Sequence, residues 1–138
     1  MTYAGDLTPH QAMELLIERS DAVLVDVRTR AEWSYVGVPD LAPIGKQAVL
    51  VEWLGFPDFK PNPAFLDELS GAGVRAGAPV VFLCRSGVRS VAAAKAATAA
   101  GLGPAYNVLD GFEGPPDARK HRGASAGWKA AGLPWTQS

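Results

Sequence analysis

The only cysteine of the chain, Cys84, opens the segment with the clearest chemical potential, Cys84-Arg-Ser-Gly-Val-Arg89. The apolar run 79–83 precedes it and predicts a buried strand, and the alanine-rich stretch after it predicts a helix. The cysteine therefore lies in a glycine-containing loop between a strand and a helix N-terminus. Ligands bind at that edge of a parallel α/β sheet, where backbone N–H groups and the helix dipole attract anions.

Two arginines flank this cysteine, and their charge favours the thiolate over the thiol. Arg89 could turn back into the loop and offer a planar, bidentate fork to an anion. Arg85 either binds the same anion or lies at the rim of the loop and attracts the anion only through its positive charge. Ser86 adds a small hydroxyl, Gly87 permits positive φ and close approach of an anion, and Val88 completes the loop. We therefore predict a nucleophilic cysteine in an anion-binding cradle.

Composition limits the other roles of the cysteine. One cysteine cannot form an intramolecular disulfide or complete a four-ligand zinc site, and the two histidines, His10 and His121, lie far apart in sequence. We expect no metal site. Because a lone cysteine is most often a small buried apolar residue, the prediction depends on the position of Cys84 rather than on its presence.

Length and charge indicate one domain over residues 1–138 and exclude several partner classes. A chain of 138 residues is typical of a single domain, and a formal net charge of -1 gives no general attraction for nucleic acid or an anionic membrane. No apolar run is long enough to cross a bilayer, and the N-terminus lacks the features of a secretory signal. We expect a cytoplasmic protein without nucleic-acid or membrane partners.

Predicted strands and helices alternate along the chain, which favours an α/β sandwich with a parallel sheet. Short apolar runs predict strands at 23–27, 48–52, 79–83 and 105–109. Capping signals and helical spacing predict helices at 9–19, 30–35, 63–70 and 89–100, with a last helical turn at 128–131. The glycine- and proline-containing stretch 37–47 is expected to be a loop.

The cysteine loop resembles the active-site loop of the rhodanese family of sulfurtransferases, and three further landmarks of that family follow in order. They are Asp26-Val-Arg28 with Glu32-Trp33, Asn107-Val-Leu-Asp-Gly-Phe112 and Gly127-Trp-Lys-Ala-Ala-Gly-Leu-Pro134. The resemblance implies a rhodanese-like three-layer α/β/α sandwich with a central parallel sheet. It also implies that no metal or organic cofactor takes part.

The resemblance further implies a sulfurtransferase of the thiosulfate type. The Cys84 thiolate attacks the outer sulfur of a small anionic donor such as thiosulfate, sulfite leaves, and the cysteine becomes a persulfide. A nucleophilic acceptor then takes the sulfur, which is cyanide in an assay and a thiol or a protein in the cell. The loop amides and Arg89 stabilise the negative charge. Since the chain has no second cysteine, an external acceptor must discharge the persulfide.

Two alternatives stay open beside this reading. A non-enzymatic or partner-directed persulfide carrier, or a regulatory binding module, would have the same loop. A Cdc25-like phosphatase or arsenate reductase fits less well, because its loop has one more residue between Cys and Arg than the four at 85–88. Such phosphatases also commonly have His before the Cys, where this chain has Leu83.

We expect Asp26, Arg28 and Glu32 to support the structure rather than to catalyse. Asp26 is expected to accept backbone N–H bonds below the loop, and Arg28 to pair with Glu32 four residues on. The chain departs from the family pattern at 36–39, where Gly-His is usual, and at 113–126, a loop of 14 residues. This longer loop contains Arg119-Lys-His-Arg122, which is either a solvated charged loop or a cationic flap that recruits an anionic donor.

Overall fold

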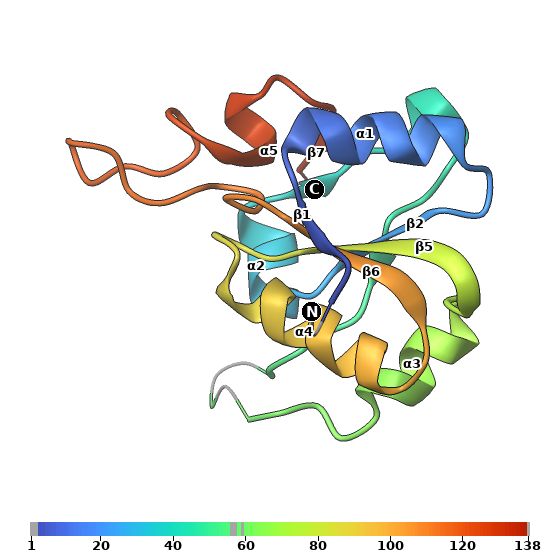
Figure 1. Cartoon of the computed structure of the whole chain (residues 1–138). Coiled ribbons are helices and arrows are strands. Elements are labelled where there is room, and N and C mark those ends of the chain that lie inside the picture. Colours follow the sequence, from blue (N-terminus) through green and yellow to red (C-terminus); the bar gives the residue numbers. More distant parts are fainter. Residues whose placement is uncertain (1–2, 56–57, 59, 138) are drawn as a thin grey trace.

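Five parallel strands form the central sheet of the computed structural model, which describes residues 3–55, 58 and 60–137. Across the sheet their order is β1-β6-β5-β2-β4, and every neighbouring pair is parallel. The strands are β1 (Gly5–Leu7), β2 (Val23–Asp26), β4 (Val49–Leu50), β5 (Ala76–Leu83) and β6 (Gly103–Val108). Their carboxyl ends therefore meet at one edge of the sheet, on the left in Figure 1.

Helices cover both faces of this sheet, which confirms the predicted three-layer α/β/α sandwich (Figure 1). On one face lie α1 (Pro9–Glu18) and α5 (Gly127–Ala130), and on the other lie α3 (Phe65–Gly71) and α4 (Val88–Ala99). The short helix α2 (Arg30–Tyr35) follows β2 at the carboxyl edge. A 3-10 turn at Ala42–Ile44 and a small antiparallel pair, β3 (Val38–Pro39) with β7 (Trp135–Thr136), complete the structure.

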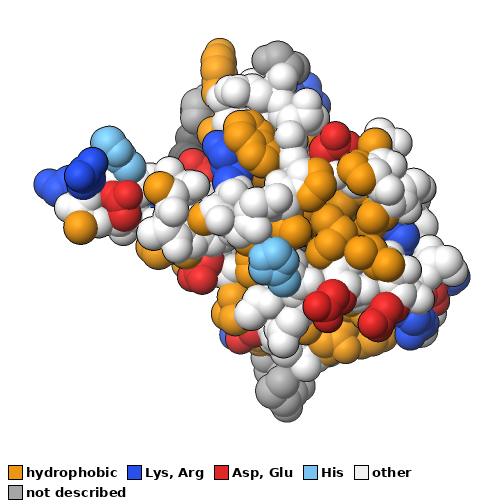
Figure 2. Space-filling view, turned by 90° about the horizontal axis from the view of Figure 1, so that it is seen from above, with side chains coloured by type: hydrophobic (Ala, Val, Ile, Leu, Met, Phe, Trp, Pro, Cys, Tyr) orange, Lys and Arg blue, Asp and Glu red, His pale blue; other side chains and the backbone are white. Residues whose placement is uncertain are grey.

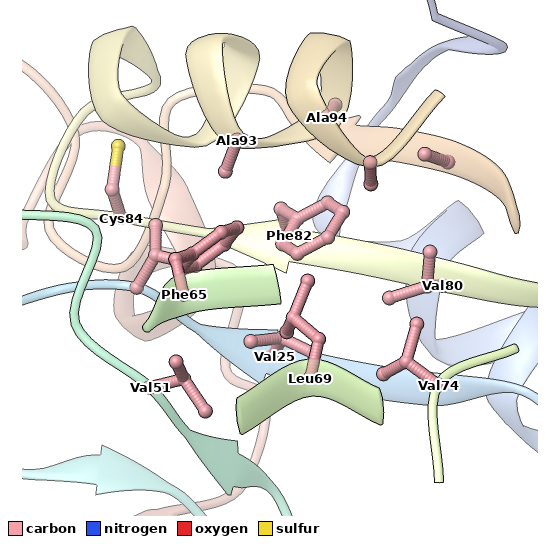
Figure 3. Close-up of a cluster of buried hydrophobic side chains, with 13 residues drawn as sticks. Val25, Val51, Phe65, Leu69, Val74, Val80, Phe82, Cys84, Ala93 and Ala94 are labelled. Atoms are coloured by element: carbon pink, nitrogen blue, oxygen red, sulfur yellow. The ribbon is translucent and has the colours of Figure 1, made fainter. Parts of the chain in front are cut away.

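Cys84 belongs to one of the two clusters of buried hydrophobic side chains (Figure 3). This cluster packs β2 and β5 against α3 and α4, with Phe82 and Leu69 among its buried side chains. Ala93, Ala94 and Ala97 of α4 are 0% exposed, and their small side chains let this helix lie close to the sheet. Cys84 forms the end of the cluster nearest the first turn of α4.

Most of the predicted elements are confirmed. Thr8 caps α1 with the expected capping box, and Thr29 caps α2 in the same way. The predicted strands appear within a few residues of their bounds, and so does the helix after the cysteine loop. In the described part of the chain, no helix is long and apolar enough to span a membrane.

Several details of the prediction are wrong. The helix expected from residue 63 begins at Phe65, because the side chain of Asn62 accepts a hydrogen bond from the Ala64 N–H and holds a turn there (3.0 Å). The expected loop 37–47 contains β3 and the 3-10 turn, and neither β1 nor β7 was predicted.

A backbone clamp supports the cysteine loop from below. The N–H of Phe112 donates to the Cys84 carbonyl oxygen (2.7 Å), and the N–H of Glu113 donates to the Arg85 carbonyl oxygen (3.0 Å). Gly111 makes this approach possible with φ of 61°. A Cβ there would lie 2.6 Å from the Arg85 carbonyl carbon and would also overlap the Cys84 carbonyl. The Asp-Gly-Phe landmark is therefore a structural requirement of the active loop.

We predict that Gly111→Ala destabilises the fold much more than Gly132→Ala. Both glycines have positive φ, but a Cβ at Gly132 would meet nothing within 4 Å. Gly132→Ala should therefore cost only the backbone penalty, about 1–2 kcal/mol. Gly111→Ala adds overpacking against the loop and should cost about 2–5 kcal/mol. Free energies of unfolding from urea titrations measure both, and equal losses would contradict the clamp.

Candidate active site

Cys84 follows the last residue of β5, and its sulfur is enclosed by the loop and the first turn of α4. The side chain is only 1% exposed. The Gly87 N–H donates to its Sγ at 3.1 Å, and the Ser90 Oγ lies 3.2 Å from the same sulfur. Figure 3 shows the sulfur directed toward the start of α4. The predicted position at a strand end and a helix N-terminus is therefore confirmed.

The first two carbonyl groups of the loop are occupied by hydrogen bonds. The carbonyl oxygens of Cys84 and Arg85 accept hydrogen bonds from the clamp 112–114. Gly87 takes φ of 119° and serves as the N-cap of α4 without a side-chain cap. The first N–H groups of a helix have no partners within it, so this turn can hold negative charge with backbone N–H groups.

Asp26 and Arg28 form a buried ion pair beneath the loop, which corrects the predicted pairing of Arg28 with Glu32. The Arg28 Nη2 donates to the Asp26 Oδ2 at 2.7 Å and to the Gly37 carbonyl oxygen at 2.6 Å, and both side chains of the pair are 0% exposed. The guanidinium also lies 4.2 Å from the ring centre of Phe112. Asp26 accepts the Arg28 backbone N–H, as expected.

Glu32 pairs with Arg89 instead. The Nη1 and Nη2 of Arg89 donate to the two carboxylate oxygens of Glu32 at 2.6 and 3.0 Å. Burial disfavours the charge of Glu32, but the hydrogen bonds and charge of Arg89 outweigh it, and the pKa of Glu32 lies below its usual range. Burial likewise opposes the charge of Arg89, yet Glu32 raises its pKa above the usual value. The guanidinium group of Arg89, which was expected to bind an anion, therefore binds the Glu32 carboxylate.

A pocket of about 590 Å³ opens between the loop and α2. The loop contributes Arg85 and Arg89, and the rest of the wall comes from α2 and the residues on either side of it. These are Thr29, Ala31, Glu32, Tyr35 and Val36. Arg85 is exposed and, among the described residues, its side chain makes no salt bridge. Of the two loop arginines, Arg85 thus offers its charge to a ligand.

The other predicted loop residues lie around this site. Ser86 and Gly87 are half-buried, and Val88 is 80% exposed. Among described residues, no three His, Cys, Asp or Glu side chains lie together as a metal ion would need.

A chain of hydrogen-bonded side chains leads away from the Cys84 sulfur, and the sequence analysis did not assign these residues to the site. The Ser90 Oγ lies 2.5 Å from the Asn107 Oδ1, and the Asn107 Nδ2 donates to the Asp6 Oδ1 at 3.0 Å. Tyr3 donates its hydroxyl to the same Asp6 oxygen at 2.9 Å. The position of Ser90 in the first turn of the helix after the cysteine loop was the sequence feature that could have indicated its contact with the sulfur.

This chain of hydrogen bonds assigns the direction of the Ser90 hydroxyl. Asp6 accepts from the Asn107 amide N–H, so the amide turns its oxygen toward Ser90. The Ser90 proton then goes to the Asn107 oxygen or to the Gly87 carbonyl (3.1 Å), and the Cys84 sulfur competes for it. Asn107 therefore reduces the hydrogen bonding that Ser90 can give to a thiolate.

The segment 113–126 projects from the same edge of the molecule as the cysteine loop (Figure 1). Gly123 N–H donates to the Glu113 carbonyl at 2.6 Å, and Arg122 donates to the Gly114 carbonyl at 2.7 Å. Arg119, Lys120 and His121 are exposed, and basic side chains gather at the outer end of this projection (Figure 2). The cationic flap stays a prediction.

We predict that Asn107→Leu favours the Cys84 thiolate. Without the Asn107 oxygen, the Ser90 hydroxyl can donate to the sulfur, and one such hydrogen bond should stabilise the thiolate by about 1 kcal/mol. Ultraviolet thiolate absorbance against pH measures the midpoint. The control is the same change in a Ser90→Ala background, where no shift is expected. An equal shift in both backgrounds would show that Asn107 does not act through Ser90.

We also predict a pH-dependent stability contribution from Glu32. Since folding lowers its pKa, this contribution is complete above the unfolded value, about pH 4.3, and is lost as the pH falls through the lower folded value. Glu32→Gln keeps the acceptor of the capping box but removes the charge. At neutral pH it should cost about 1–3 kcal/mol in unfolding free energy.

Urea titrations across this pH range give the difference between wild type and Glu32→Gln. It should shrink as Glu32 becomes protonated in both the folded and the unfolded chain. A constant difference would mean that the charge of Glu32 does not stabilise the fold.

Comparisons with known proteins agree with this arrangement. The family model described as the STR4 middle domain matches residues 5–138. The crystal structure of Rv0390 from M. tuberculosis is similar at 58% identity and a TM-score of 0.90, covering 99% of each chain. The protein THYLAKOID RHODANESE-LIKE, chloroplastic, from Oryza sativa subsp. indica is 31% identical over 136 residues, which are 96% of this chain and 25% of that protein.

A further solved structure shares the fold. The polysulfide-sulfur transferase of Wolinella succinogenes has a TM-score of 0.66 and 24% identity, covering 99% of this chain and 80% of that one. The family model covers the parallel sheet, the Cys84 loop and the Asp-Gly-Phe clamp. The chain belongs to the rhodanese-like family and matches the model of the STR4 middle domain.

Proposed function

We propose that this protein is a sulfurtransferase that moves sulfane sulfur through a persulfide on Cys84. The observation that carries the proposal is the position of the sulfur. It receives the Gly87 N–H at 3.1 Å, beside the N-terminus of α4, and the next residue, Arg85, lines a pocket and makes no salt bridge within the described residues. A nucleophilic cysteine in such a setting supports covalent transfer of an anionic group.

In the proposed reaction, the Cys84 thiolate attacks the terminal sulfur of the donor. A new S–S bond forms on Cys84, and the bond between the terminal sulfur and the rest of the donor breaks. The leaving group takes the electron pair; with thiosulfate it is sulfite. A nucleophilic acceptor then attacks the outer sulfur of the persulfide, and Cys84 returns as a thiolate. No metal or organic cofactor enters either step.

The loop is suited to the negative charge of the persulfide. The outer sulfur carries the charge, and the N–H groups of the Gly87 turn and the first turn of α4 can hold it. The clamp 112–114 binds the carbonyl oxygens of Cys84 and Arg85, which limits movement of the loop that carries these donors. Preorganised donors of this kind stabilise developing charge without reorganisation.

A phosphatase or arsenate reductase is disfavoured by the same loop. Only four residues, 85–88, separate Cys84 from Arg89, one fewer than in the phosphatase pattern. In addition, the Arg89 fork, which would have to bind a phosphate, is held by Glu32. A partner-directed persulfide carrier would use the same first step and differ only in its acceptor.

We predict that Cys84 gains one sulfur atom when the protein is incubated with an excess of thiosulfate or an organic thiosulfonate. Intact mass spectrometry measures the gain, and cyanide should reverse it with formation of thiocyanate. Cys84→Ser removes the nucleophile and should show no gain, while circular dichroism confirms that it folds. A protein that gains no sulfur from either donor would refute the proposed function.

A further inference from the structure

A row of polar side chains joins the surface of the molecule to the buried Cys84 sulfur. Asp6 on the edge strand β1 is exposed and lies beside Asn107 of β6, its partner in the strand register (Figure 1). Asn107 is 3% exposed and contacts Ser90, which is 0% exposed and lies 3.2 Å from the sulfur. Two side chains therefore separate an exposed carboxylate from the reactive atom.

The Asp6 carboxylate directs its hydrogen bonds into this row. Its Oδ1 accepts the Asn107 Nδ2 at 3.0 Å and the Tyr3 hydroxyl at 2.9 Å. No salt bridge among the described residues includes Asp6. The Ala4 N–H donates to the Ala105 carbonyl oxygen at 2.8 Å, where β1 begins to pair with β6. The backbone of the sheet, rather than a cation, therefore holds this carboxylate in place.

Asp6 is the member of the row whose hydrogen-bonding role is fixed. An ionised carboxylate only accepts hydrogen bonds, whereas an amide can turn either its oxygen or its nitrogen toward a neighbour, and a hydroxyl can donate or accept. Tyr3 also stays a donor, because its hydrogen bond to Asp6 raises the pKa of the phenol above its usual value. Asp6 therefore keeps the Asn107 nitrogen on its own side and turns the amide oxygen toward Ser90.

The Asn107 oxygen holds the Ser90 proton. It lies 2.5 Å from the Ser90 Oγ, whereas the Gly87 carbonyl oxygen lies at 3.1 Å and the Cys84 sulfur at 3.2 Å. Since an amide oxygen carries no hydrogen, the proton in so short a contact comes from Ser90. With the amide turned the other way, Ser90 would accept from the nitrogen, and its own proton would be free for the sulfur.

We propose that Asp6 is a positioning residue for the Cys84 nucleophile. By fixing the Asn107 amide, it withholds the Ser90 hydroxyl from the sulfur, which keeps the Gly87 N–H. A thiolate with fewer hydrogen bonds forms less readily but is the stronger nucleophile. The inference rests on the proposed sulfurtransferase function for its purpose, whereas its main test, thiolate formation, does not depend on sulfur transfer.

The main variant is Asp6→Ala, and ultraviolet thiolate absorbance against pH measures its effect. Without the fixed acceptor, both orientations of the Asn107 amide are available, and one of them frees the Ser90 hydroxyl for the sulfur. This hydrogen bond should lower the midpoint of thiolate formation by about 0.5 pH unit, a rise of about threefold in the ratio of thiolate to thiol. Circular dichroism confirms that the variant folds.

Two controls separate the amide from other effects. Asp6→Ala also removes a negative charge, and that effect should be the same in a Ser90→Ala background, where the hydroxyl is absent. The shift should therefore be about 0.5 pH unit larger when Ser90 is present. Tyr3→Phe keeps the ring at the start of β1 and removes the other hydrogen bond to Asp6, so it should leave the midpoint unchanged.

Equal shifts with and without Ser90 would mean that only charge acts, and the positioning role would be wrong. A shift in Tyr3→Phe as large as that in Asp6→Ala would also overturn it, because a disturbed β1 would then be the cause.

A rate measurement tests the strength of the nucleophile. At a pH above both midpoints, Asp6→Ala should take up sulfur from thiosulfate roughly 1.5–2-fold more slowly than the wild type, because its thiolate has the additional hydrogen bond. Faster uptake would contradict the proposal. If neither protein takes up sulfur while the midpoints shift as expected, the sulfurtransferase function fails and the positioning role of Asp6 stands.

Discussion

The buried ion pair of Asp26 and Arg28 is the constraint on which the active loop depends. Both side chains are 0% exposed, and a charge buried in this way is costly unless its partners are in place. Arg28 reaches the Gly37 carbonyl and the ring of Phe112, and the N–H of Phe112 holds the Cys84 carbonyl. The pair therefore connects β2, the chain after α2 and the clamp that binds the Cys84 carbonyl.

The second ion pair, Glu32 with Arg89, joins α2 to the first turn of α4. It brings the apolar wall of α2 beside the cysteine loop, and at the same time it neutralises the arginine that the loop sequence offers most directly for anion binding. One contact thus contributes to the fold and also sets the charge of the pocket. Because of this dual effect, the sequence of the cysteine loop alone does not determine the charge of the pocket.

Local patterns predicted most of the architecture, because capping boxes, apolar runs and glycine positions act over a few residues. They failed where partners come from distant segments. The spacing rule that paired Arg28 with Glu32 applies within a helix, but α2 is capped by Thr29, so Arg28 lies before the helix and points into the core. β1 and β7 are too short to show a periodic pattern. The role of Asn107 depends on Asp6, 101 residues away.

The site divides its chemistry between backbone and side chains. The backbone N–H of Gly87, the N-cap of α4, donates to the sulfur, and any sequence that folds into this loop supplies it. Most of the side chains that line the neighbouring pocket belong to α2 or flank it, outside the cysteine loop. A loop motif can therefore predict where the cysteine and its N–H donor lie, whereas the lining and charge of the pocket depend on α2 and on the partner that holds Arg89.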